Sequence, residues 1–95
     1  MSTYNLQVIQ VKNKHFVSLR TDLRTAQEVH NDGISGYNAG HRAPIYDALF
    51  NANLSDISVI NVQTNLPKYK GLKIKGSMVE AFNIAGTGLN VKNVA

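Results

Sequence analysis

Apolar and polar side chains alternate along the first twenty residues. From Tyr4 to Val11, aliphatic and β-branched residues are spaced by polar ones, which is the pattern of a strand with a buried face. Residues 12–14 have the polar composition of a turn, and residues 15–19 return to strand-forming side chains. We therefore expect a β-hairpin over residues 4–20.

The next segment has the spacing of an amphipathic helix. Asp22 is a favourable N-cap, and Leu23, Ala26 and His30 share one face, so the pattern predicts a helix from Leu23 to about His30. Gly33 is expected to end this helix. Residues 33–41 contain three glycines and are expected to form a mobile loop, a kind of segment that often carries functional residues.

A second helix, a third strand and a third helix complete the pattern. Pro44 suits the first helical position, and Ile45, Leu49 and Ala52 are expected to face inward. Residues 54–56 form a turn, and residues 57–62 form a strand that is expected to be buried on one face. The polar residues 63–70 are expected to form a loop, and the last helix is expected at 77–85.

The order of elements is therefore ββααβα within one domain, residues 1–95. We expect an α/β fold with a small three-stranded antiparallel sheet flanked by three helices. The absence of cysteine excludes disulfides, thiolate zinc sites and a cysteine nucleophile. Neither a membrane-spanning apolar run nor a signal-peptide pattern occurs, so we expect a cytoplasmic protein without a membrane partner.

The chain is basic, with a net charge of +4 and a pI near 9.6. Such a charge attracts anionic partners, nucleic acid above all, but also serves solubility alone. The basic candidates for contacts with nucleic acid flank the first helix, occupy the glycine-rich segment and form a lysine-rich stretch. They are Arg20, Arg24, His41, Arg42, Lys68 and Lys70. Their alternative roles are a solvated basic face, loop polarity and, for the lysines, protection of an edge strand.

The order of elements also resembles the GIY-YIG nuclease domain family, over roughly residues 4–92. Seven pieces carry the resemblance, in chain order. They are Phe16-Val17-Ser18 at the Tyr-Ile-Gly triplet, Asp22-Leu23 at an Asn-Leu pair, His30 on the first helix, His41 before the second helix, Ile45–Leu49, Glu80 at the metal-binding glutamate, and Gly88-Leu89-Asn90 at a closing Gly-Tyr-Asn.

The resemblance implies a Mg²⁺-dependent nuclease site with Glu80 as the metal ligand and with His30 and Tyr4 as remnants of the catalytic set. Four positions depart from the family pattern. Leu6 stands at the reactive tyrosine, Phe16 lacks the second hydroxyl, Ser18 stands at the following glycine, and Ala26 replaces the essential arginine. Losing such an electrostatic stabiliser typically costs about 3 kcal/mol, which is on the order of a hundredfold in rate.

Three functional hypotheses follow. The preferred one is a catalytically impaired GIY-YIG-like domain, of phage or mobile-element type, that acts by binding nucleic acid or a host or rival protein. The second is a divergent Mg²⁺-dependent endonuclease that uses Tyr4, Arg20 or Arg24, His30 and Glu80. The third is a small inhibitory or structural protein that uses its sheet edge or residues 33–43. Glu80 is alternatively a solvated helix residue and His30 a packed one, while the oligomeric state and the target are open.

Overall fold

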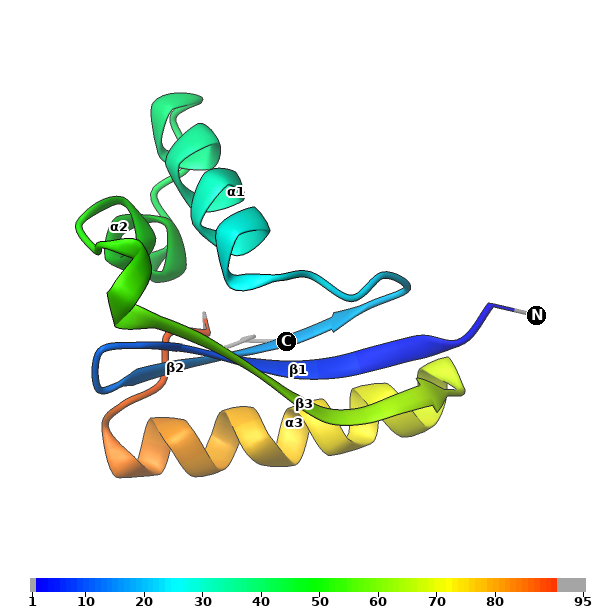
Figure 1. Ribbon diagram of the computed structural model, residues 1–95. Coiled ribbons are helices and arrows are strands. Elements are labelled where there is room, and N and C mark those ends of the chain that lie inside the picture. Colours follow the sequence, from blue (N-terminus) through cyan, green and yellow to red (C-terminus); the bar gives the residue numbers. More distant parts are fainter. Residues whose placement is uncertain (1, 91–95) are drawn as a thin grey trace.

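A computed structural model describes residues 2–90, so residue 1 and residues 91–95 of the expected domain lie outside the described part. A three-stranded antiparallel sheet has helices on both of its faces (Figure 1). The elements within this part are β1 (Tyr4–Val11), β2 (Lys14–Arg20), α1 (Ala26–Asn38), α2 (Pro44–Phe50), the 3₁₀ helix η1 (Leu54–Asp56), β3 (Ile57–Leu66) and α3 (Lys68–Ala85). The expected ββααβα order and α/β class are confirmed.

β1 is the central strand, in the order β2-β1-β3. The tight turn after Val11 pairs it with Lys14, and Lys12 in that turn has a φ of 56°. On the other side, β1 pairs with β3 through the Ile9–Val59 register. Because helices cover both faces of the sheet, four consecutive residues of β1, 6–9, are buried. The hairpin expected over residues 4–20 is confirmed.

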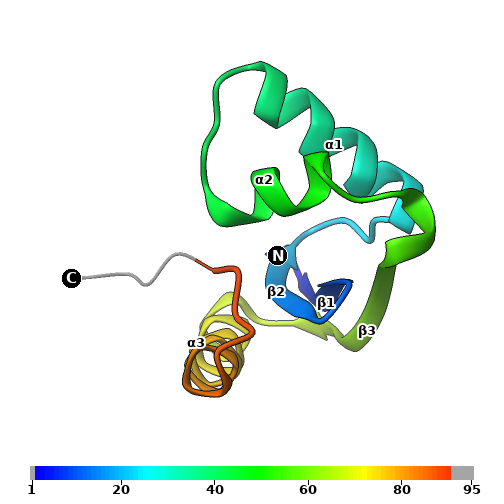
Figure 2. The same cartoon turned by 90° about the vertical axis from the view of Figure 1, so that its left-hand side faces the viewer.

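The core formed by residues 2–90 consists of two clusters, one on each face of the sheet. α1 and α2 cover one face and α3 covers the other (Figures 1 and 2). Under α1 and α2, Ile9 and Val11 pack against Val29 and Leu49. The cluster beneath α3 contains the buried residues Leu6, Val17 and Leu66, with Ile74, Met78 and Phe82 of α3 packed against them. None of the helices in residues 2–90 combines the length and the apolar character needed to cross a bilayer.

α1 starts later than expected. Its N-cap is Thr25 rather than Asp22: the Thr25 hydroxyl accepts from the Glu28 N–H at 3.2 Å, and the Glu28 carboxylate accepts from the Thr25 N–H at 3.1 Å. This reciprocal capping box satisfies two free N–H groups at the helix start. Asp22 pairs with Arg20 instead. Leu23 precedes the helix and is 50% exposed, so the expected helix start at Leu23, with Leu23 on one helical face with Ala26 and His30, is wrong.

α1 also ends later than expected, because Gly33 and Gly36 lie inside it. A Cβ at Gly33 would lie 2.6 Å from Leu49 Cδ1, and one at Gly36 would overlap the ring of Tyr46. Both glycines therefore permit a close approach of α1 to α2 rather than ending the helix. The expected loop over residues 33–41 is wrong, and residues 39–43 alone connect the two helices.

The second half of the chain contains longer elements than expected. β3 continues to Leu66 with register shifts against β1, and α3 begins at Lys68, directly after its N-cap Pro67. The polar loop expected at 63–70 is therefore wrong, as is a helix start at 77. Gly71 and Ile74 face the sheet while the lysines of the first turns lie in solvent, so the polar composition reflects an amphipathic helix.

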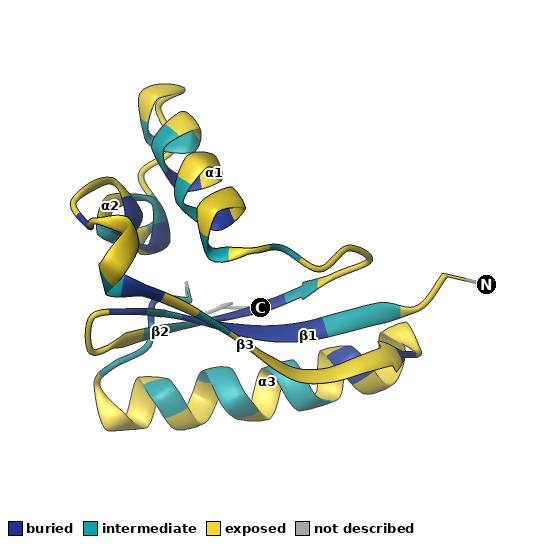
Figure 3. Ribbon diagram, viewed as in Figure 1, coloured by how far each residue is buried: buried dark blue, intermediate teal, exposed yellow. Residues whose placement is uncertain are grey.

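β3 is more exposed than expected. Figure 3 shows its central part as exposed, and Ile60 and Val62 keep 48% and 43% of their surface in solvent. α3 packs on β2 and β1, and Figure 2 shows β3 extending beyond it. The expectation of a strand buried along one face therefore fails, and the lysines at 68 and 70 lie on a helix rather than on an edge strand.

The segment after α3 covers the free edge of β2. Gly88 forms a parallel bridge with His15, and the Leu89 N–H donates to the His15 carbonyl at 2.7 Å. The Asn90 side chain accepts from the Val17 N–H at 2.8 Å and donates to the Val17 carbonyl at 3.1 Å. These bonds satisfy backbone groups that an edge strand would otherwise expose.

The contact between α1 and α2 yields a first prediction. Gly33→Ala should lower the free energy of unfolding by about 1–3 kcal/mol, because the added methyl group overlaps Leu49 near its backbone. The matched control is Gly76→Ala in α3, where a Cβ meets no atom within 4 Å. That change should raise stability by about 0.5–1 kcal/mol, because alanine favours the helix. Urea unfolding measures both, and equal effects would contradict the close packing.

Candidate functional site

An open cleft of about 480 Å³ lies between β2 and the pair of helices α1 and α2. Its floor is apolar and includes Ile9 and Val29 of the core. Polar groups from five parts of the fold line it: Arg20 at the end of β2, Arg24 before α1, Asp32 in α1, His41 and Tyr46 around the start of α2, and Lys75 from α3. Chemistry-bearing side chains that are distant in sequence therefore meet at one place.

Gln7 on the central strand positions Arg24. Gln7 is 2% exposed. Its side-chain carbonyl oxygen accepts from the Arg24 N–H and its side-chain amide donates to the Arg24 carbonyl, both at 3.2 Å. The same amide donates to Asn61 Oδ1 at 2.8 Å. A buried amide is tolerated only when it is hydrogen-bonded, and Gln7 meets this condition by holding the segment before α1 against the sheet.

The Arg24 guanidinium is a largely buried charge of the cleft, with its side chain 12% exposed. Nη1 donates to Asp32 at 3.1 Å and Nη2 donates to the Ser18 hydroxyl at 3.2 Å. Nε is buried and has no hydrogen-bond partner. Buried arginine is normally fully hydrogen-bonded, so this side chain has more donors than the protein satisfies.

Arg20 forms a second ion pair at the end of β2. Its Nε lies 2.7 Å from Asp22, and both side chains are about half exposed. The hydrogen bond from Arg20 lowers the pKa of Asp22 below its ordinary value, and the same bond raises the pKa of Arg20. Arg20 is thus permanently charged, and Asp22 offsets part of that charge.

The rings of His41 and Tyr46 stack on each other at the edge of the cleft. Their ring centroids are 5.2 Å apart with an interplanar angle of 25°. Tyr46 lies directly against Gly36, and the His41 N–H donates to the Gly36 carbonyl at 3.0 Å. Gly40, with a φ of 99°, makes the turn between α1 and His41. The close packing of α1 against α2, which requires Gly33 and Gly36, therefore also fixes the positions of these two rings.

The structure brings together three of the residues singled out from the sequence, namely Arg20, Arg24 and His41. His30 lies elsewhere on α1, where its Nε2 donates to the Ala52 carbonyl at 3.0 Å. Tyr4 begins β1 opposite Leu66 and is not among the residues that line the cleft.

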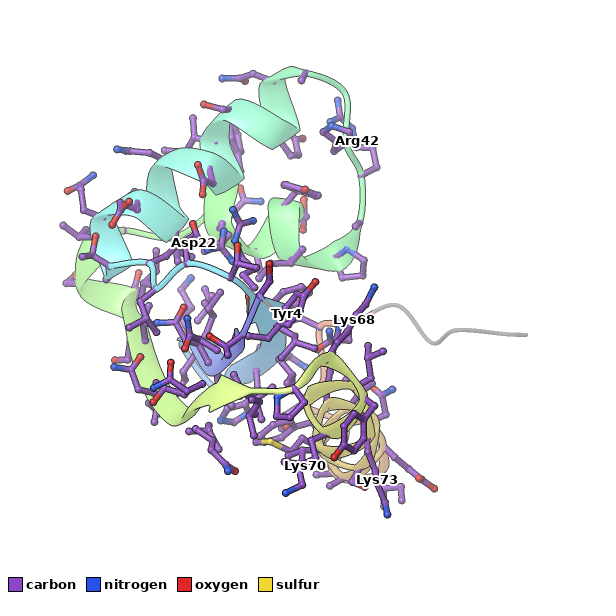
Figure 4. All side chains as sticks on the ribbon, turned by 90° about the vertical axis from the view of Figure 1, so that its right-hand side faces the viewer. Tyr4, Asp22, Arg42, Lys68, Lys70 and Lys73 are labelled. Carbon is purple, nitrogen blue, oxygen red and sulfur yellow. The ribbon has the colours of Figure 1, made fainter. Side chains whose placement is uncertain are left out.

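The remaining candidates are spread over the surface. Arg42 stacks on the Tyr37 ring at 4.2 Å and donates to the Tyr37 carbonyl at 2.7 Å. Figure 4 shows Arg42 on the connection between α1 and α2, far from Lys68 and Lys70 around the start of α3. These cations could reach the phosphates of a long strand, but they do not form a single site with the cleft.

Glu80 is exposed on α3 and does not line the cleft. Over residues 2–90, no three side chains of the His, Cys, Asp and Glu types come together as a possible ligand set. Magnesium is usually held by one or two carboxylates together with substrate phosphates. The described residues around Glu80 therefore do not fit a preformed Mg²⁺ site.

The structure adds Asp32, Tyr46, Lys75, Ser18 and Gln7 to the site. Two of these, Gln7 and Tyr46, had a signal in the sequence. Gln7 is a polar residue within an otherwise apolar stretch of the first strand, and Tyr46 follows Gly33 and Gly36, which are spaced one helical turn apart. Lys75 had none, because its place depends on how α3 packs against the sheet. Comparisons with protein-family models, with curated proteins and with solved structures gave no match to this chain.

The Arg20–Asp22 pair yields a second prediction. The carboxyl of Asp22 should titrate below the ordinary value of about 3.9, and Arg20→Gln should return it towards that value. Because the folded pKa is the lowered one, the pair stabilises the fold above pH 4 and ceases to do so as the pH falls through the folded pKa. Exposed pairs contribute only about 0.2–1 kcal/mol.

Carboxyl NMR shifts recorded against pH measure this pKa directly. Asp22→Asn should show its small loss of stability at neutral pH and none in strong acid. A pKa of Asp22 that is unchanged by Arg20→Gln would contradict the ion pair.

Proposed function

We propose that this protein is a GIY-YIG-like domain that binds nucleic acid through its basic cleft and does not cut it efficiently. The observation that carries the proposal is the convergence on one cleft of Arg20 from β2, Arg24 from the segment before α1, and Lys75 from α3. Clustered cations attract the phosphate backbone whatever its sequence. The order of the strands and helices supports the fold part of the proposal.

The cleft suits a phosphate group chemically. Arg24 offers a planar set of donors, and Asp32, the one carboxylate among the described cleft residues, accepts from only one of its nitrogens. Phosphate oxygens commonly accept from arginine in this way, and the Ser18 hydroxyl nearby offers a further group. Asp32 offsets part of the positive charge of the cleft and pairs with the buried arginine.

Binding is favoured over cleavage by what occupies the nuclease-like positions. Leu6 is fully buried under α3, and Phe16 and Ala26 both pack against the core cluster under α1 and α2. None of these side chains carries a hydroxyl group or a charge, so none can activate water or stabilise phosphate. Glu80, the expected metal ligand, points to solvent outside the cleft.

One observation keeps an endonuclease as the second candidate. Arg24 and the phenol of Tyr46 line the same cleft, so a cation and a tyrosine are available there from other positions of the chain. One donor that stabilises the charge of a transition state contributes about 2.7–4 kcal/mol in known enzymes. Arg24 in such a position would therefore give measurable nuclease activity.

The binding proposal predicts a cleft-specific effect of charge removal. Lys75→Gln should weaken binding of a labelled oligonucleotide and reduce the slope of log affinity against log salt by about 1. The matched control is Lys12→Gln, which removes the same charge from the exposed hairpin turn. Fluorescence anisotropy between about 50 and 200 mM salt measures both variants. Equal losses in the two variants, or no binding at low salt, would overturn the cleft as the site.

Cleavage is tested separately with supercoiled plasmid and Mg²⁺. We expect no nicking above the buffer background, even at high protein concentration. Nicking that requires Mg²⁺ and is lost in Tyr46→Phe would establish the endonuclease instead. Glu80→Ala serves as a second variant, because a loss of activity there would place the metal on α3 despite the exposure of this glutamate.

A further inference from the structure

His41 presents an exposed imidazole at the edge of the cleft, beside the cations. We propose that an unpaired nucleobase stacks on His41 while its phosphates lie against Arg20, Arg24 and Lys75. The target class is then a single strand, or a locally unpaired nucleotide, rather than an intact duplex. This inference rests on the proposed function and specifies which form of nucleic acid the cleft takes.

The imidazole of His41 is held in place before any ligand arrives. Its backbone N–H bonds to Gly36, its ring lies on Tyr46, and Tyr46 in turn rests on the backbone of α1 at Gly36. A ring that is already fixed loses little conformational freedom on binding, so most of the stacking free energy is available for affinity.

The other aromatic rings that stack on a neighbour or line the cleft are less suited to a base. Tyr37 has Arg42 at 4.2 Å and Phe50 at 4.0 Å, so both groups already compete for its surface. His15 stacks on Phe82 at 4.4 Å, and neither ring lines the cleft. Phe16 and Tyr46 line the cleft but are partly buried, which leaves His41 as the exposed ring there.

The volume of the cleft is also appropriate for a ligand of the size of a small molecule. Ligand pockets for small molecules range over roughly 300–1,000 Å³, and this cleft of about 480 Å³ falls within that range. Bases in a duplex are stacked and paired inside the helix and do not reach a ring beside the backbone cations. Unpaired bases stack on aromatic side chains with little dependence on sequence, because every base has a π-face.

The experiment compares a short single strand, the same strand with abasic sites, and the matching duplex at one salt concentration. The wild-type protein should bind the base-containing single strand more tightly than the duplex. His41→Ala should weaken binding of the base-containing strand by about tenfold, which is within the usual range for loss of one stacking residue. It should leave binding of the abasic strand unchanged, and His41→Tyr should restore the affinity.

The outcomes separate this inference from the proposed function. Equal loss on the abasic strand, or a duplex bound as tightly as the single strand, would overturn base stacking while nucleic-acid binding stands. Lys75→Gln should weaken both strands alike, because it removes a phosphate contact. No binding of any of the three ligands would overturn the proposed function itself. Circular dichroism of His41→Ala and His41→Tyr checks that each variant is folded.

Discussion

The close approach of α1 to α2 is the constraint on which the rest of the site depends. Gly33 and Gly36 let Leu49 and Tyr46 lie directly against the backbone of α1. Leu49 joins the core above the sheet, whereas Tyr46 forms one wall of the cleft and carries the ring of His41. A larger side chain at either glycine would separate the helices and displace both the core residue and the wall, because protein interiors are closely packed.

The central strand fixes the side of the cleft that carries Arg24. Gln7 ties the segment before α1 to the sheet, which places the Arg24 guanidinium between Ser18 of β2 and Asp32 of α1. The result is a cation that is mostly buried yet retains an unpaired N–H. Structural ion pairs also leave charges buried, but this one lies in a cleft with two further cations, and that grouping is what supports anion binding.

The fold was largely predictable from the sequence, because the alternation of apolar and polar side chains over residues 4–20 is a local signal of a β-hairpin. β1 has the expected bounds, whereas the helix boundaries failed where packing overrode propensity. Gly33 resembled a helix stop but is needed inside α1, although the Thr25 and Glu28 capping box could have been read from the sequence. The basic character of the site was predictable, but its assembly was not, since Lys75 lines the same cleft as Arg24 only through the packing of α3 against the sheet.

The most direct test of the central claim follows the side chain of Arg24 itself. NMR spectra of the ¹⁵N-labelled protein resolve arginine Nε–H groups, and a short oligonucleotide can be titrated in at low salt. We expect the Arg24 Nε–H signal to shift to saturation together with the backbone amides of His41 and Lys75, while that of Arg42 stays unchanged. Saturable binding that shifts Arg42 and the residues at the start of α3 but leaves Arg24 unaffected would contradict the cleft as the binding site.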